Sequence, residues 1–151
     1  MDSAKIKILI VDDEESITKL LATLLKDQVD EIKVAYNGKE ALNIVKKEKG
    51  ISLILTDIKM PIMDGLEFIK RVREMGHDTP VIFFTGYGSQ EYMVQALEYG
   101  AYDFIDKPNL ENLEEIVGRC INEKFGKVKN GQEKKAEADW ADDYKKVIIK
   151  K

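Results

Sequence analysis

Acidic side chains follow two apolar runs of this sequence at the point where each run ends. Asp12 and Asp13 come directly after residues 6–11, and Asp57 comes directly after residues 51–56. Carboxylates held side by side repel one another strongly at low effective dielectric, and a fold tolerates them where a cation neutralises the charge. Mg²⁺ takes oxygen ligands and is commonly held by one or two carboxylates together with phosphate oxygens. The pattern therefore predicts a magnesium site.

The same acidic residues also fit a purely structural interpretation. Acids in the first turn of a helix are favoured by the helix dipole, and Ser16 could help to cap a helix that starts here. This interpretation accounts well for Glu14 and Glu15. It explains neither Asp57 nor Lys107, which follows a further apolar run.

Five apolar runs must position these side chains. They span residues 6–11, 32–36, 51–56, 81–85 and 101–105. Amphipathic stretches long enough for helices lie between them, and Gly50, Gly76 and Gly100 fall where the second, third and fourth helices should end. This alternation predicts a doubly wound α/β fold, with helices on both faces of a parallel sheet and run 32–36 at its edge. Function is expected at the carboxyl ends of the strands.

Composition excludes several classes of protein. The chain has 151 residues, 24 basic and 28 acidic, and is 44% hydrophobic, which suits an ordinary soluble domain. It has no apolar run long enough for a membrane span and no signal-like start, so we expect a cytoplasmic location. Cys120 is the only cysteine, which excludes an internal disulfide framework and predicts a reduced, buried thiol.

The charge changes sign near Gly126. Residues 1–125 carry a net charge of −7 and residues 126–151 carry +3. We therefore expect one domain over 1–125, followed by a charged C-terminal tail over 126–151.

Apolar residues around Trp140 recur at helical spacing. This pattern is typical of an amphipathic helix that folds back, dimerises or docks on a partner. A frayed basic tail or vector-derived sequence is the alternative.

Four motifs lie at the ends of the expected strands. They are Ile10-Val11-Asp12-Asp13-Glu14, Thr56-Asp57-Ile58-Lys59-Met60-Pro61-Ile62-Met63-Asp64-Gly65, Thr85-Gly86-Tyr87-Gly88 and Gly100-Ala101-Tyr102-Asp103-Phe104-Ile105-Asp106-Lys107-Pro108. In this order they resemble the receiver domain of bacterial response regulators, the chemotaxis-regulator-like family of two-component signalling. The resemblance covers residues 5–125. It implies a flavodoxin-like, five-stranded parallel sheet in the order 2-1-3-4-5 with five helices.

The resemblance also implies a phosphoryl-transfer site. Asp57 would take a phosphoryl group from a phosphohistidine on a sensor kinase or phosphotransfer protein. Asp13 and Asp57 would bind Mg²⁺ with the backbone carbonyl of Lys59, and Asp12 would act mainly through a water. Lys107 would pair with a phosphoryl oxygen, and its peptide bond to the following proline is expected to be cis.

Further roles follow from the resemblance. Thr85 and Phe104 would form the switch, with the Phe104 ring turning inward from a more exposed position; a plain core aromatic is the alternative for Phe104. Lys59 and Tyr87 would modulate the lifetime of the phosphoryl group, which we expect to be long. Asp64 is expected to cap the third helix.

Only 26 residues follow residue 125, too few for an output domain with its own core, so we expect a stand-alone phosphoacceptor that catalyses only its own phosphorylation and dephosphorylation. Its output would be the face formed by helix four, strand five and helix five, which would bind a downstream protein and allow phosphorylation-dependent homodimers; direct nucleic-acid binding is not expected. A phosphorelay intermediate remains an alternative. An aspartyl-nucleophile phosphatase would need a second aspartate where Lys59 stands, and a flavodoxin-like electron carrier would need a flavin-phosphate loop where residues 12–15 are acidic.

Overall fold

Strands and helices alternate strictly along the chain. The structure, a computed structural model, describes residues 5–86, 88, 90–107 and 109–126. The strands are β1 Lys7–Val11, β2 Glu31–Ala35, β3 Leu53–Thr56, β4 Val81–Thr85 and β5 Asp103–Asp106. The helices are α1 Glu15–Leu25, α2 Gly38–Lys47, α3 Gly65–Glu74, α4 Gln90–Glu98 and α5 Leu110–Phe125.

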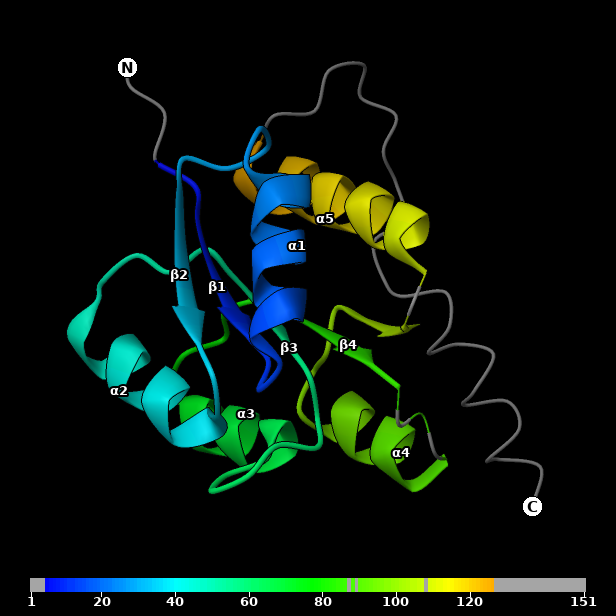
Figure 1. Ribbon diagram of the computed structural model, residues 1–151. Helices are drawn as coiled ribbons and strands as arrows, with labels where there is room; N and C mark the ends of the chain where they lie inside the picture. Colours follow the sequence, from blue (N-terminus) through cyan, green and yellow to red (C-terminus); the bar gives the residue numbers. More distant parts are fainter. Residues whose placement is uncertain (1–4, 87, 89, 108, 127–151) are drawn as a thin grey trace.

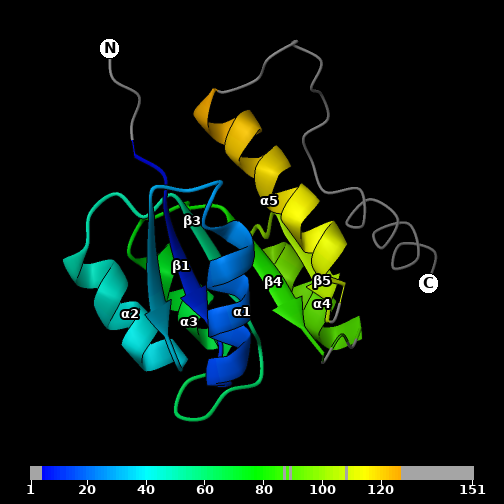
Figure 2. The ribbon, with the colours of Figure 1, turned by 45° about the horizontal axis from the view of Figure 1, so that its top comes forward.

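The five strands form one parallel sheet in the order β2-β1-β3-β4-β5, which confirms the predicted flavodoxin-like topology. Helices α1 and α5 cover one face and α2, α3 and α4 cover the other (Figures 1 and 2). Each face buries its own apolar cluster, one containing Leu21 and Val117 and the other Phe68 and Phe83. Among the described residues, no helix is long and apolar enough to cross a membrane.

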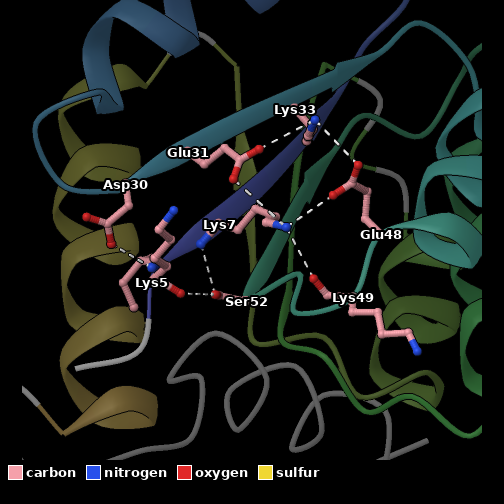
Figure 3. Close-up of polar contacts among 9 residues, drawn as sticks. Lys5, Lys7, Asp30, Glu31, Lys33, Glu48, Lys49 and Ser52 are labelled. Atoms are coloured by element: carbon pink, nitrogen blue, oxygen red, sulfur yellow. Dashed lines mark hydrogen bonds and ion pairs between the residues drawn. The ribbon is translucent and has the colours of Figure 1, made fainter. Parts of the chain in front are cut away.

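The burial of each strand follows its place in the sheet. β3 and β4 are buried throughout, as expected for strands covered on both faces. β2 is only half-buried, which confirms it as an edge. Lys33 on this edge pairs with Glu31 and with Glu48 at 3.4 Å each, and Lys7 reaches Glu48 at 3.1 Å (Figure 3). Charged side chains of this kind discourage the edge from pairing with another chain.

Two local predictions need correction. Run 101–105 was expected to be the fifth strand, but β5 begins at Asp103 because the Ala101 amide still bonds to the Ala96 carbonyl of α4, at 3.0 Å. Ser16 does not cap α1. The helix begins one residue earlier, at Glu15. The amide of Glu14, just before the helix, donates to the Asp12 carboxylate at 2.9 Å.

Other local predictions are confirmed. Gly50, Gly76 and Gly100, which follow α2, α3 and α4, have φ values of +82°, +90° and +74°. Asp64 caps α3 by accepting a bond from the Glu67 amide at 2.8 Å. The expected amphipathic helix around Trp140 and the cis bond to Pro108 lie outside the described residues.

Candidate functional site

The sheet brings Asp12, Asp13 and Asp57 together at the carboxyl ends of its strands. β1 and β3 are neighbours, with Val11 paired to Thr56, so the residues that follow the two strands lie side by side. The Asp57 amide continues this ladder by donating to the Val11 carbonyl at 2.9 Å. The carboxyl edge predicted as the functional end of the sheet therefore carries the acidic cluster.

Lys107 reaches this cluster from β5, at the far side of the sheet. Its ammonium lies 2.8 Å from Asp12 Oδ2 and 2.9 Å from Asp57 Oδ2, across 95 and 50 residues of sequence. The Lys107 amide donates to the Thr85 carbonyl at 3.0 Å, which anchors its backbone to the end of β4. The remaining Asp57 oxygen, Oδ1, accepts a bond from the Ile58 amide at 2.7 Å. Both oxygens of the Asp57 carboxylate are thus held in place.

The electrostatics of the cluster are unbalanced. Asp12 is 1% exposed and Asp57 is 4% exposed. Burial raises the pKa of Asp12 above its usual range, against the hydrogen bond from Lys107 that lowers it. Burial also disfavours the Lys107 ammonium, but its bonds to Asp12 and Asp57 prevail and raise its pKa. The single ammonium of Lys107 therefore pairs with two buried carboxylates, those of Asp12 and Asp57, and leaves the cluster with net negative charge.

The arrangement is suited to a hard divalent cation. Carboxylate oxygens of Asp12, Asp13 and Asp57 lie within 4.8 Å of one another. Asp13 is exposed while the other two are buried, so the cluster is open to solvent on one side. An all-oxygen donor set with an open side matches the preference of Mg²⁺, which keeps several of its waters.

The expected switch residues lie in the neighbouring strands β4 and β5. Thr85 is fully buried at the end of β4. Phe104 is 8% exposed, with its ring centroid 6.0 Å from that of Phe83, so the more exposed orientation expected for Phe104 is not the one observed. Packing against the core keeps the ring inside. Gly88 adjoins it, since a Cβ there would lie 3.5 Å from the Phe104 ring and 2.9 Å from Asp106 Oδ1.

Lys59 lies in the loop between β3 and α3, two residues after Asp57. Its ammonium is 5.9 Å from the centre of the Tyr92 ring on α4, a cation–π distance that links this loop to α4. Sequence reasoning placed Lys59 near the site but missed Tyr92, because nothing in the local pattern pairs these two positions. The other expected modulating residue, Tyr87, lies outside the described residues.

Two glycines allow the β3–α3 loop to pack against the site, and sequence reasoning assigned neither of them a role in the site. A Cβ on Gly65 would collide with the Asp57 carbonyl oxygen. A Cβ on Gly38 would lie 2.6 Å from the Met63 carbonyl oxygen, which accepts a bond from the Gly38 amide at 2.8 Å. The loop can approach Asp57 this closely because both positions lack side chains.

Comparisons with known proteins agree with this architecture. A family profile described as the response regulator receiver domain matches residues 8–118. The chain is 40% identical over 116 residues to the regulatory protein AtoC of Escherichia coli K12, covering 76% of this chain and 25% of AtoC. It is 40% identical over 113 residues to the transcriptional regulatory protein CpxR of the same strain, covering 75% of this chain and 47% of CpxR. The chain thus spans between about a quarter and about half of these relatives' lengths.

A solved structure gives the same result at the level of the fold. The response regulator receiver domain protein (CheY-like) from Methanospirillum hungatei JF-1 superposes with a TM-score of 0.74 at 32% identity. The match covers 80% of this chain and 96% of that protein.

Proposed function

The chain belongs to the response regulator receiver family, and on that premise we propose that it accepts a phosphoryl group on Asp57 from a phosphohistidine of a sensor kinase or a histidine phosphotransfer protein. The observation that carries the proposal is the position of Lys107, whose ammonium contacts both Asp12 and Asp57 at the carboxyl edge of the sheet. A buried carboxylate held between a lysine and further carboxylates is arranged for phosphoryl transfer, which depends on positioning and charge neutralisation.

The transfer is a displacement at phosphorus. A carboxylate oxygen of Asp57 forms the new P–O bond while the P–N bond to the donor histidine breaks, and the imidazole leaves with the electron pair and takes up a proton. The Ile58 amide and Lys107 orient the carboxylate before the reaction. Because its pKa is raised, Lys107 remains an ammonium at neutral pH and can pair with a phosphoryl oxygen.

Asp12, Asp13 and Asp57 are the side chains that would hold Mg²⁺, with the Lys59 carbonyl as a further proposed ligand. When bound, the ion neutralises charge on the transferring phosphoryl group. The chain's own part is to keep these carboxylates together at the open side of the site, where Lys107 alone leaves negative charge.

We propose a signalling output in place of turnover on a substrate. Thr85 would bond the phosphoryl group, and Phe104 would respond, changing the face of α4, β5 and α5 that a downstream protein, or a second copy of this chain, reads. Action as a response regulator or as a phosphorelay intermediate, in the cytoplasm, belongs to the same proposal. Lys59 and Tyr87 would lengthen the phosphoryl lifetime by crowding the attacking water.

The test is labelling with phosphoramidate and Mg²⁺, followed by mass spectrometry of the intact protein. We expect one phosphoryl group per chain in the wild type and none in Asp57→Asn. Asp27→Asn, which removes an exposed carboxylate at the other end of the sheet, is the matched control and should label normally. Equal labelling of Asp57→Asn would refute the proposal, and multiple turnover on phosphate esters would favour a phosphatase.

A further inference from the structure

Ile62, in the loop between β3 and α3, has a backbone conformation that β-branched residues rarely adopt. Its φ is +71°, the only positive φ of a non-glycine residue within the described ranges. The Met63 amide donates to the Pro61 carbonyl across it at 2.7 Å. A hydrogen bond that spans one residue with φ near +75° is the rare and strained form of the γ-turn. Strain is therefore concentrated at this residue.

The strain at Ile62 is not offset by burial. Its side chain is 76% exposed, more than the other large hydrophobic side chains exposed in the described part of the chain. A single exposed apolar residue is ordinary on a protein surface, but Ile62 combines an exposed apolar side chain with a strained backbone, and each is unfavourable. Backbone bonds on either side, from Gly38 to Met63 and from Gly65 to Ile58, at 2.8 Å each, keep the loop in this shape.

Ile62 stands at the rim of the phosphoacceptor site. The Gly65 amide closes the loop onto Ile58, the residue after Asp57. Ile62 is three residues from Gly65 and so lies within about 11 Å of it. Figures 1 and 2 both show this loop projecting from the carboxyl end of the sheet, the end at which α1 begins.

Any protein that delivers a group to Asp57 must cover this rim. Asp57 is 4% exposed, so a phosphohistidine reaches it only when the donor surface rests on the surrounding loops. The α1 side of the rim carries the exposed acids Asp13, Glu14 and Glu15, which favour a donor with basic side chains there. Ile62 supplies an apolar contact beside these charges.

We infer that Ile62 is an apolar anchor for the protein that donates the phosphoryl group: a histidine-phosphorylated protein whose docking face combines an apolar pocket with basic side chains. The inference rests on the proposed function, because it concerns the donor to Asp57. A small phosphodonor has no docking face, so its reaction with Asp57 does not depend on Ile62.

The experiment compares two donors on the same variants. The protein donors are the histidine kinases encoded with this chain in its genome, autophosphorylated with ATP, and the histidine phosphotransfer proteins that these kinases phosphorylate. The donor with the fastest transfer is used, and the small donor is phosphoramidate. Ile62→Gly removes the side chain and relieves the strain, and Ile62→Leu keeps an apolar group. Met75→Ala truncates an exposed side chain, 39% exposed, that follows the last residue of α3, and serves as the matched control.

For Ile62→Gly we expect transfer from the protein donor to slow about tenfold or more, with phosphoramidate labelling within twofold of wild type. Ile62→Leu should recover most of the transfer, and Met75→Ala should behave as wild type. Unchanged transfer from the protein donor in Ile62→Gly, an equal loss with both kinds of donor, or transfer from none of the protein donors overturns the inference. Failure of phosphoramidate to label wild-type Asp57 would instead refute the proposed function itself.

Discussion

At the scale of single residues, the chemistry depends on how Lys107 is shared. Its ammonium contacts Asp12 and Asp57, both buried, while the third carboxylate, Asp13, faces solvent. A buried ion pair adds little to stability compared with apolar packing, but removing one partner leaves an uncompensated charge that is costly. With three carboxylates and one ammonium, the site therefore favours the binding of a cation.

Lys107→Met should lower the free energy of unfolding by about 3 kcal/mol at pH 7, because two buried carboxylates lose their cation. The loss should shrink on acidification. Burial raises the pKa of Asp12, and the hydrogen bond from Lys107 lowers it. Without Lys107 the pKa rises further, so as pH falls through it the variant's folded state gains more stability by taking up a proton than the wild type does. Urea unfolding at pH 7 and pH 5 measures both effects.

The control for this variant is Lys19→Met, which removes a lysine that is 75% exposed and pairs with Glu15. It should change the free energy of unfolding by less than about 0.5 kcal/mol at either pH. A Lys107→Met protein as stable as Lys19→Met at pH 7 would show that the carboxylates of Asp12 and Asp57 do not repel each other as described.

At the scale of elements, close packing of the β3–α3 loop sets the position of Asp57. Gly65 begins α3 where a Cβ would meet the Asp57 carbonyl oxygen. Gly65→Ala should therefore cost about 3 kcal/mol or more, since backbone must shift to admit a methyl group. Gly86→Ala is the matched control: nothing lies within 4 Å of its Cβ position, and it should stay within about 0.5 kcal/mol. Similar urea midpoints for the two variants would contradict this packing.

Cys120 lies on the buried face of α5, so the reactivity of its thiol measures how tightly that helix packs on the sheet. The thiol is fully buried, and burial raises its pKa to about 12. At pH 8 almost all of the thiol is therefore protonated, and the reactive thiolate is scarce. Iodoacetamide should leave the native protein unmodified over hours. In about 8 M urea, where the chain is unfolded, it should alkylate Cys120 within minutes. Rapid alkylation of the native protein would mean that α5 detaches from the sheet.

At the scale of the whole molecule, the sheet and the location of the acidic cluster were predictable from sequence, because both depend on periodicity and on where apolar runs end. The order of strands came from the family resemblance. Contacts of the β3–α3 loop with neighbouring helices were not predictable: neither the cation–π pair of Lys59 with Tyr92 nor the fit of Gly38 against Met63 leaves a local pattern. The inward position of Phe104 fits the core-aromatic alternative, but its contact with Phe83 in the neighbouring strand leaves no local pattern either.

Binding of Mg²⁺ should couple the site to the stability of the entire domain. A ligand that binds only the folded state raises the free energy of unfolding by about 2.7 kcal/mol at one hundred times its dissociation constant. The wild type should therefore melt several degrees higher in excess Mg²⁺, and chelation with EDTA should reverse the shift. Asp13 is exposed, so Asp13→Asn removes a proposed ligand without disturbing the core, and its melting temperature should respond far less to Mg²⁺. An equal rise in both proteins would place the ion elsewhere on the molecule and remove the metal from the proposed mechanism.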